Sequence, residues 1–231
     1  MRKGIAYFAL LCFSLSSPLW AQDFQNLNFE QIDPSVIPSD QFHDNLPIED
    51  AMPGWTGYLG TNQLTAVLYN NTTLGAASIS LYGPNSFPSA ILEGQFTAGL
   101  VRGGDGAGNF MNVSLAQTGL IPFGAHSVLL RAAGTNFAVS FSPQTIPSAQ
   151  AIPLVAISNG PNYTVYAGDI FAFAGQVGEL RISTVSILGA GVLFDAIAFS
   201  FEAIPEPSSL NLVAIGIVGL AFFRRASRKT P

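Results

Sequence analysis

The amino-acid sequence predicts an all-β protein, an antiparallel sandwich or barrel of short strands, with an apolar targeting segment at each end. Short apolar or alternating segments recur between turn residues at intervals of about 8–15 residues, and helical periodicity is scarce. The two ends differ from the remainder, because each combines basic residues with an uncharged apolar run. The sequence therefore divides into residues 1–21, a body of residues 22–204, and a tail of residues 205–231.

The first 21 residues have the three parts of a secretory signal peptide. Arg2 and Lys3 precede an apolar run from Ile5 to Leu15, and a stretch of small residues ends at Ala21. We expect signal peptidase to cleave after Ala21. The one cysteine lies in the removed segment, so the mature chain would contain no disulfide and no thiol nucleophile.

The body is long enough for one domain with a complete core. Its strands are expected where side chains alternate or apolar residues cluster, as in Leu180 and Ile182 against Arg181 and Ser183. The expected strands are residues 63–69, 76–82, 90–100, 112–117, 127–131, 137–141, 152–157, 163–166, 179–188 and 192–201.

Three other segments of the body have patterns of their own. Pro34 to Pro53 is rich in Pro and Asp and predicts a long loop. A short helix is expected near Ala167 to Phe173. The glycine-rich Gly103 to Asn109 does not open a helix after a strand, so it indicates a hairpin loop and not a nucleotide-binding turn.

The charge of the body limits its partners. It contains 13 Asp and Glu, three arginines and no lysine, a formal net charge of −10. This balance argues against binding nucleic acid or anionic lipid.

The tail has three parts. Pro205, Glu206 and Pro207 come first, an apolar segment of residues 208–223 follows, and Arg224 and Arg225 open a basic end of residues 224–231. As a helix the apolar segment would span roughly 21–24 Å, short of the ~30 Å hydrocarbon core. The basic flank nevertheless indicates a short transmembrane helix with its cytoplasmic side at the C-terminus.

This combination resembles the PEP-CTERM sorting signal of Gram-negative bacteria. The resemblance implies recognition by an exosortase through Pro205, Glu206 and Pro207, with processing near this motif. It also implies export through the inner membrane and delivery to the cell envelope, the outer surface or the extracellular matrix. The C-terminal helix would hold the protein in the membrane before processing.

The body has a second resemblance. Leu27-Asn28-Phe29-Glu30 near its start and Leu193-Phe194-Asp195-Ala196-Ile197-Ala198-Phe199 near its end are similar to the opening and closing strands of galactose-binding-like jelly rolls, a group that includes many carbohydrate-binding modules. The resemblance implies a jelly-roll sandwich and makes Glu30 and Asp195 candidate ligands of a structural calcium ion. The alternative is that both are ordinary carboxylates at strand ends.

Aromatic residues beside glycines are candidates for sugar binding. Trp55 and Tyr58 lie in Gly54-Trp55-Thr56-Gly57-Tyr58, and a flat ring could stack on a sugar there. The alternative for Trp55, which its size and apolarity favour, is a place in the core.

No recognised catalytic motif is present, since the sequence contains neither an HExxH nor a Gly-x-Ser-x-Gly pattern. The sequence thus predicts a non-enzymatic surface or matrix protein that binds extracellular polysaccharide. Two alternatives stay open. One is a carbohydrate-active hydrolase on the same fold, built from two of the 13 carboxylates. The other is a structural surface protein without a ligand.

Overall fold

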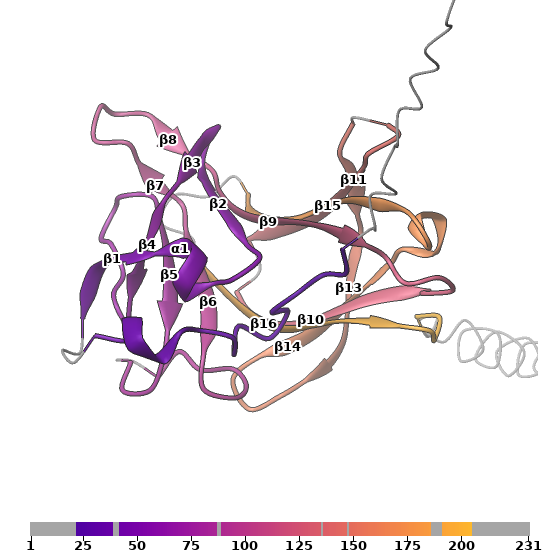
Figure 1. Cartoon of the computed structure of the whole chain (residues 1–231), viewed down its shortest axis with the longest axis horizontal. Helices are drawn as coiled ribbons and strands as arrows, with labels where there is room; N and C mark the ends of the chain where they lie inside the picture. The colour runs from indigo at the N-terminus through magenta and orange to yellow at the C-terminus, as the bar shows by residue number, and fades with distance from the viewer. Residues whose placement is uncertain are drawn as a thin grey trace, which may run out of the picture.

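The computed structural model describes residues 22–38, 42–86, 89–134, 136–146, 148–185 and 191–204. These residues form two large β-sheets that face each other, as expected for a sandwich (Figure 1). The expected signal helix and C-terminal membrane helix lie outside the described residues. Within the described residues, no helix is long and apolar enough to cross a membrane.

The first sheet has eight strands in the order β1-β4-β5-β6-β16-β10-β14-β13, and neighbouring strands are antiparallel except β4 and β5. Its strands are β1 (His43–Pro47), β4 (Ala66–Tyr69), β5 (Ser78–Tyr82), β6 (Thr97–Val101), β10 (Ser127–Ala133), β13 (Leu154–Asn159), β14 (Thr164–Asp169) and β16 (Gly191–Ser200).

The second sheet has six strands in the order β12-β11-β15-β9-β2-β3, all antiparallel. Its strands are β2 (Thr56–Leu59), β3 (Asn62–Leu64), β9 (Val113–Leu120), β11 (Phe137–Pro143), β12 (Gln150–Ile152) and β15 (Val177–Thr184). A separate hairpin joins β7 (Gly103–Gly104) to β8 (Phe110–Met111), which confirms the hairpin predicted for the glycine-rich segment.

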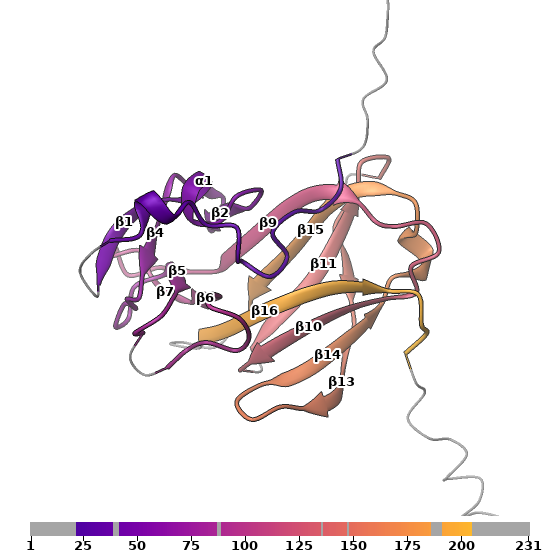
Figure 2. The same cartoon turned by 60° about the horizontal axis from the view of Figure 1, so that its bottom comes forward.

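Alternation along the strands decides which side chains enter the core. In β15, Leu180 and Ile182 are buried, whereas Glu179 and Arg181 point to the other face and are partly exposed. β10 follows the same rule with Val128 and Leu130 inward. Successive side chains of a strand point to opposite faces, so each sheet presents one apolar and one polar surface. The two apolar surfaces meet between the layers, where the buried hydrophobic residues form one cluster; the ribbons of the two layers can be followed in Figure 2.

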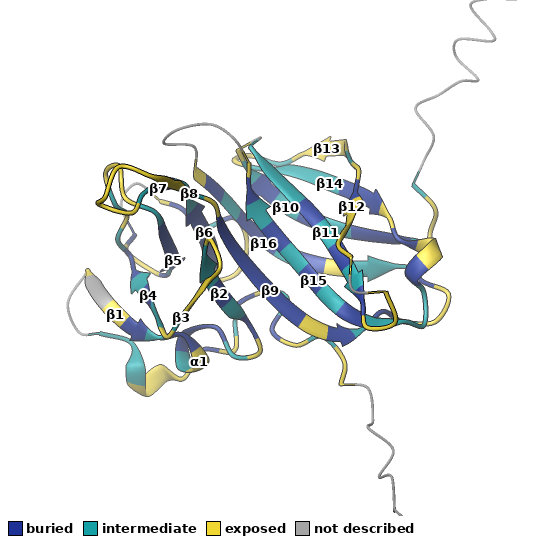
Figure 3. Ribbon diagram, turned by 90° about the horizontal axis from the view of Figure 1, so that it is seen from above, coloured by how far each residue is buried: buried dark blue, intermediate teal, exposed yellow. Residues whose placement is uncertain are grey.

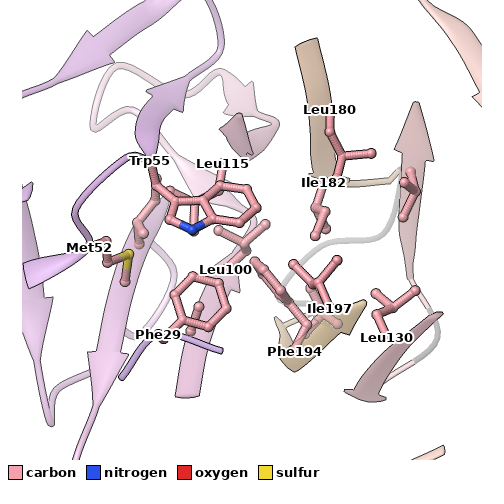
Figure 4. Packing of buried hydrophobic residues seen from close by; sticks show 14 of the residues in the cluster. Phe29, Met52, Trp55, Leu100, Leu115, Leu130, Leu180, Ile182, Phe194 and Ile197 are labelled. Atoms are coloured by element: carbon pink, nitrogen blue, oxygen red, sulfur yellow. The ribbon is translucent and has the colours of Figure 1, made fainter. Parts of the chain in front are cut away.

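Aromatic side chains fill the centre of this core. Phe29, which is fully buried, lies between Trp55 and Phe194, with ring centroids 5.4 and 5.5 Å apart respectively (Figure 4). Phe29 comes from the opening segment, and Phe194 comes from the last strand. The core therefore joins the two ends of the body.

The structure corrects three predictions. The segment from Pro34 to Pro53 is not one long loop, because it contains the 3-10 helix η1 (Pro34–Val36), strand β1 and helix α1 (Ile48–Ala51). The expected strand 63–69 is two strands in different sheets, divided at Thr65. The expected helix at 167–173 is the end of β14 followed by the 3-10 helix η2 (Phe171–Phe173).

A further difference concerns residues 90–100. Only Thr97–Val101 form a strand, β6, and the residues before it form a loop. The N–H groups of Glu93, Gln95 and Phe96 in this loop bond to side-chain carboxylates instead of a neighbouring strand, as described below. All described strand pairs and the whole described core come from residues 22–204.

Candidate functional site

The two carboxylates predicted to bind metal both hold residues 92–97, which are a loop and the first residue of β6 and are here called the strap. Glu30 Oε1 accepts hydrogen bonds from the N–H groups of Gln95 (2.7 Å) and Phe96 (3.0 Å). Asp195 Oδ2 accepts from the N–H of Glu93 (3.3 Å) and the hydroxyl of Thr97 (2.8 Å). The structure therefore brings Glu30 and Asp195 to one place from opposite ends of the body.

The environment of Asp195 disfavours its charge. Its side chain is only 1% exposed, and burial raises the pKa of its carboxyl to about 7. Hydrogen bonds from Thr97 and the Ala196 N–H lower this pKa, the negative charge of Glu30 raises it further, and the positive charge of Arg131 lowers it. Desolvation and the neighbouring carboxylate of Glu30 therefore both favour the neutral form of Asp195.

The strap lies so close to Glu30 that a side chain does not fit at Gly94. A Cβ atom on Gly94 would overlap Glu30 Oε1, and the backbone there has a φ of +62°, which glycine adopts without strain. An ion pair between Glu93 and Arg131 also attaches the strap to strand β10.

The carboxylate oxygens of Glu30 and Asp195 are ligands of the kind that calcium prefers, and calcium takes 6–8 oxygen ligands in all. Within the described ranges, no group of three or more His, Cys, Asp or Glu side chains is placed to hold a metal. Glu30 and Asp195 could thus supply only part of a calcium site, and backbone carbonyls or water would have to complete it.

Trp55 lies in the core and not on a binding surface. Its side chain is 4% exposed, stacks on Phe29, and donates a hydrogen bond from Nε1 to the Asn26 carbonyl oxygen at 3.0 Å. A hollow of about 380 Å³ opens beside it, lined also by Glu49 and Gln63, but the indole is not presented to solvent there. The prediction that Trp55 stacks on a sugar is therefore wrong, because its large apolar ring is needed between the sheets.

Tyr58, only three residues later, lies on the outer surface of the six-stranded sheet. The guanidinium carbon of Arg181 lies 4.4 Å from the Tyr58 ring centroid. Arg181 also donates from Nε to Glu179 Oε1 and from Nη1 to Ser114 Oγ, both at 2.8 Å. A carboxylate, a hydroxyl and an aromatic ring thus fix the planar guanidinium in one orientation.

Small and hydroxyl-bearing side chains surround this group. Strand register places them around it, since Arg181 pairs with Ala116 on one side and Ser140 on the other. Figure 3 looks onto this sheet from above. We call the surface the hydroxyl face; besides Tyr58, Glu179 and Arg181 it contains Ser114, Ala116, Thr118, Ala138, Ser140, Ser142 and Ser183.

Sequence reasoning missed Arg181 as a site residue. The alternation around Arg181 was sufficient to place it on the outer face of a strand. Its partners could not be found in this way, because Ser114 and Tyr58 come from strands whose pairing is decided far along the chain.

Comparison with known proteins identifies the tail. Residues 203–229 match the family model of the PEP-CTERM protein-sorting motif, which indicates export and sorting to the cell surface. The matched residues include Pro205, Glu206, Pro207, Arg224 and Arg225, whose conformation lies outside the described residues. No curated protein matches the chain.

Several solved structures of carbohydrate-binding modules resemble the body. TmCBM61 in complex with β-1,4-galactotriose is 11% identical with a TM-score of 0.43, covering 79% of this chain and 100% of the other. A variant of the family 29 module CBM29-2 is 12% identical with a TM-score of 0.40, covering 73% and 96% respectively. A family 11 module from Clostridium thermocellum is 7% identical with a TM-score of 0.39, covering 72% and 97%.

Proposed function

We propose that the protein is an exported, non-enzymatic surface or matrix protein whose hydroxyl face binds neutral extracellular polysaccharide. The observation that carries the proposal is the fixed Arg181–Tyr58 pair on an outer sheet surface rich in small and hydroxyl side chains. Such a surface offers a polar and aromatic group already oriented for a ligand.

The chemistry of the hydroxyl face suits a sugar chain. Ser and Thr hydroxyls both donate and accept hydrogen bonds, as sugar hydroxyls do. Ala138, Ser140, Ser142 and Ser183 are small and partly exposed, so a flat ring can approach the sheet closely there. Tyr58 and the guanidinium of Arg181 offer flat surfaces for contact with the C–H groups of a sugar ring.

Charge supports a neutral ligand. Arg181 is paired with Glu179 at 2.8 Å, so the hydroxyl face has no net charge, and the body carries −10. A polyanion such as a uronate polymer would be repelled by the body without an unpaired cation on this face to attract it.

The same face supports binding over hydrolysis. Glycoside hydrolysis by the usual mechanism uses two carboxyl groups that flank the bond. Among the residues of β2, β3, β9, β11, β12 and β15, which the structure describes in full, Glu179 is the one carboxylate, and it is bound to Arg181. The strands of the hydroxyl face thus supply one of the two carboxyl groups that this mechanism of hydrolysis needs.

We also propose that Glu30 and Asp195 hold a structural calcium ion. The meeting of two carboxylates from opposite ends of the body supports it, because the negative charge of Glu30 raises the pKa of Asp195 and a bound cation would offset that repulsion. The cation would tie the first and last segments of the body to the strap and add to stability, without a part in any reaction.

The two sorting signals complete the proposal by giving the expected location of the protein. Signal peptidase would remove residues 1–21, and the C-terminal helix would hold the chain in the membrane until an exosortase acts near Pro205 to Pro207. The body would then stand on the outer surface or in the extracellular matrix of a Gram-negative bacterium.

The test is affinity electrophoresis of the body, residues 22–204, in gels that contain cellulose derivatives, mixed-linked β-glucan, galactan or, as an anionic comparison, alginate. We expect retardation by at least one neutral polymer and loss of it in Tyr58→Ala. Tyr163→Ala is the matched control, because Tyr163 lies under Arg131 in the same way, at 5.1 Å, beside the other sheet.

Two outcomes contradict the proposal. If a folded body is retarded by none of the neutral polymers, the hydroxyl face is not a polysaccharide site. If Tyr163→Ala abolishes retardation while Tyr58→Ala preserves it, binding belongs to the eight-stranded sheet.

A further inference from the structure

Strand β13 forms an edge of the eight-stranded sheet. It pairs with β14 on one side, and no described strand pairs with its other side, as Figure 2 shows. Five of its six residues are exposed, and Val155 and Ile157 each have 42% of their surface accessible. An edge strand of this kind presents unpaired backbone N–H and C=O groups to a further strand.

This edge strand lacks the charged side chains that normally prevent an exposed edge from pairing with another strand. From Ala132 to Gly168 the sequence contains no Asp, Glu, Lys, Arg or His, although the body has a net charge of −10. One protective device is present, a bulge where Ala156 pairs with Tyr166 and Ser158 pairs with Val165. Pro153 precedes the strand and does not interrupt it.

We propose that β13 is a self-association surface, and that its partner is β13 of a second copy of this chain. Antiparallel pairing about Ala156 would set Val155 of each copy opposite Ile157 of the other. The two-fold arrangement thus makes the same apolar contact twice, which is the self-complementarity that a symmetric dimer needs.

Charge favours a second copy as the partner. Two bodies of −10 repel each other over most of their surfaces, and the segment from Ala132 to Gly168 is where they can approach with least repulsion. A strongly charged partner would find no side chain in β13 to bind.

Pairing through β13 would leave the hydroxyl face open, because that face is on the other sheet. A dimer would then present two such faces and could join two polysaccharide chains. This consequence rests on the proposed function, whereas the pairing itself does not.

The experiment is sedimentation equilibrium of the body over a wide concentration range. We expect a monomer–dimer equilibrium that tightens as salt screens the net charge. Ile157→Lys and Val155→Lys should each weaken the dimer roughly tenfold or more, because each places charge in both cross-strand contacts. Leu74→Lys is the matched control, since Leu74 is fully exposed in a loop and adds the same charge elsewhere.

A body that stays monomeric at all concentrations and salt strengths overturns the proposal. So does a dimer that persists unchanged in both β13 variants, because its interface would then lie elsewhere. Circular dichroism of each variant establishes that the fold is kept. Polysaccharide retardation of the Ile157→Lys monomer, measured separately, tests the hydroxyl face independently of the dimer.

Discussion

The Arg181 guanidinium carbon lies 4.4 Å from the Tyr58 ring centroid although strand β9 separates the strands of the two residues. The arginine side chain crosses β9 at the point where Ser114 and Ala116 are the residues on that face of the strand. Its Nη1 donates a hydrogen bond to Ser114 Oγ there. Small side chains on the middle strand therefore permit the contact. The hydroxyl face depends on three strands at once.

Replacing Arg181 by lysine should weaken polysaccharide binding more than it weakens the fold. An ammonium cannot bond to Glu179 and Ser114 in one plane and also stack on Tyr58. We expect a loss of about 1 kcal/mol in unfolding free energy, measured with urea, and loss of retardation in polysaccharide gels. Retardation equal to that of the wild type would show that the guanidinium is not used for binding.

Replacing Ala116 by leucine tests the crossing of β9 directly. Ala116 is 1% exposed and lies between Arg181 and Thr56 in the sheet. A leucine there should push Arg181 away from Tyr58 and remove binding, at a cost of about 1–3 kcal/mol for overpacking. Ala138→Leu, on a strand that the arginine does not cross, is the comparison. Equal effects of both variants would contradict this account.

Substitutions at Trp55 should change stability and leave binding intact. Trp55→Ala removes a core ring and should cost about 3–5 kcal/mol. Trp55→Phe keeps a ring against Phe29 but loses the hydrogen bond to the Asn26 carbonyl, so we expect about 1–2 kcal/mol. Thermal unfolding measures the cost. A folded Trp55→Phe body that no longer binds polysaccharide would restore Trp55 as a site residue.

Calcium should stabilise the body at high pH and not at low pH. The Asp195 carboxyl has a pKa of about 7 in the fold against an ordinary value of 3.8. Without calcium, its contribution to stability is complete below pH 3.8 and is lost as pH rises through about 7, a difference of about 4 kcal/mol. Above pH 7 the charged carboxylate can bind calcium, so millimolar calcium should raise Tm by roughly 5–10 °C at pH 8.

The Asp195→Asn variant separates this effect from the other carboxylates. It should match the wild type near pH 4, be more stable at pH 8 in EDTA, and not respond to calcium. A wild-type Tm that is the same in EDTA and in millimolar calcium at pH 8 would exclude the proposed ion.

Alanine substitutions at Gly94 and Gly106 form a matched pair that tests the contact between the strap and Glu30. Both have a positive φ, so alanine at either place strains the backbone by about 1–2 kcal/mol. A Cβ at Gly106 meets nothing within 4 Å, whereas a Cβ at Gly94 overlaps Glu30. Gly94→Ala should therefore lower Tm more than Gly106→Ala does, and it should reduce the response to calcium. Equal effects of the two substitutions would show that the close contact between Gly94 and Glu30 does not contribute to stability.

Processing of the tail can be checked by mass spectrometry of protein released from the cell surface. The PEP-CTERM motif predicts a C-terminus near Pro205 to Pro207. Recovery of an intact surface form that ends at Pro231 would contradict processing.

The sequence alone was sufficient for the features that local chemistry controls. Period-two alternation places Arg181 outward and Leu180 inward without knowledge of any neighbour. The PEP-CTERM tail is read from contiguous residues, and a match over residues 203–229 agrees with it.

Tertiary structure decided what depends on pairing between distant strands. Alternation along the strand puts Trp55 and Tyr58, three residues apart, on opposite faces, but the pairing of β2 with β9 decided which of the two faces the core. Residues 90–96 resemble a strand, but carboxylates that come from Glu30 and Asp195 bind their backbone and hold them as a loop. Backbone hydrogen bonds go to the partner that folding brings close, and a local pattern does not contain that information.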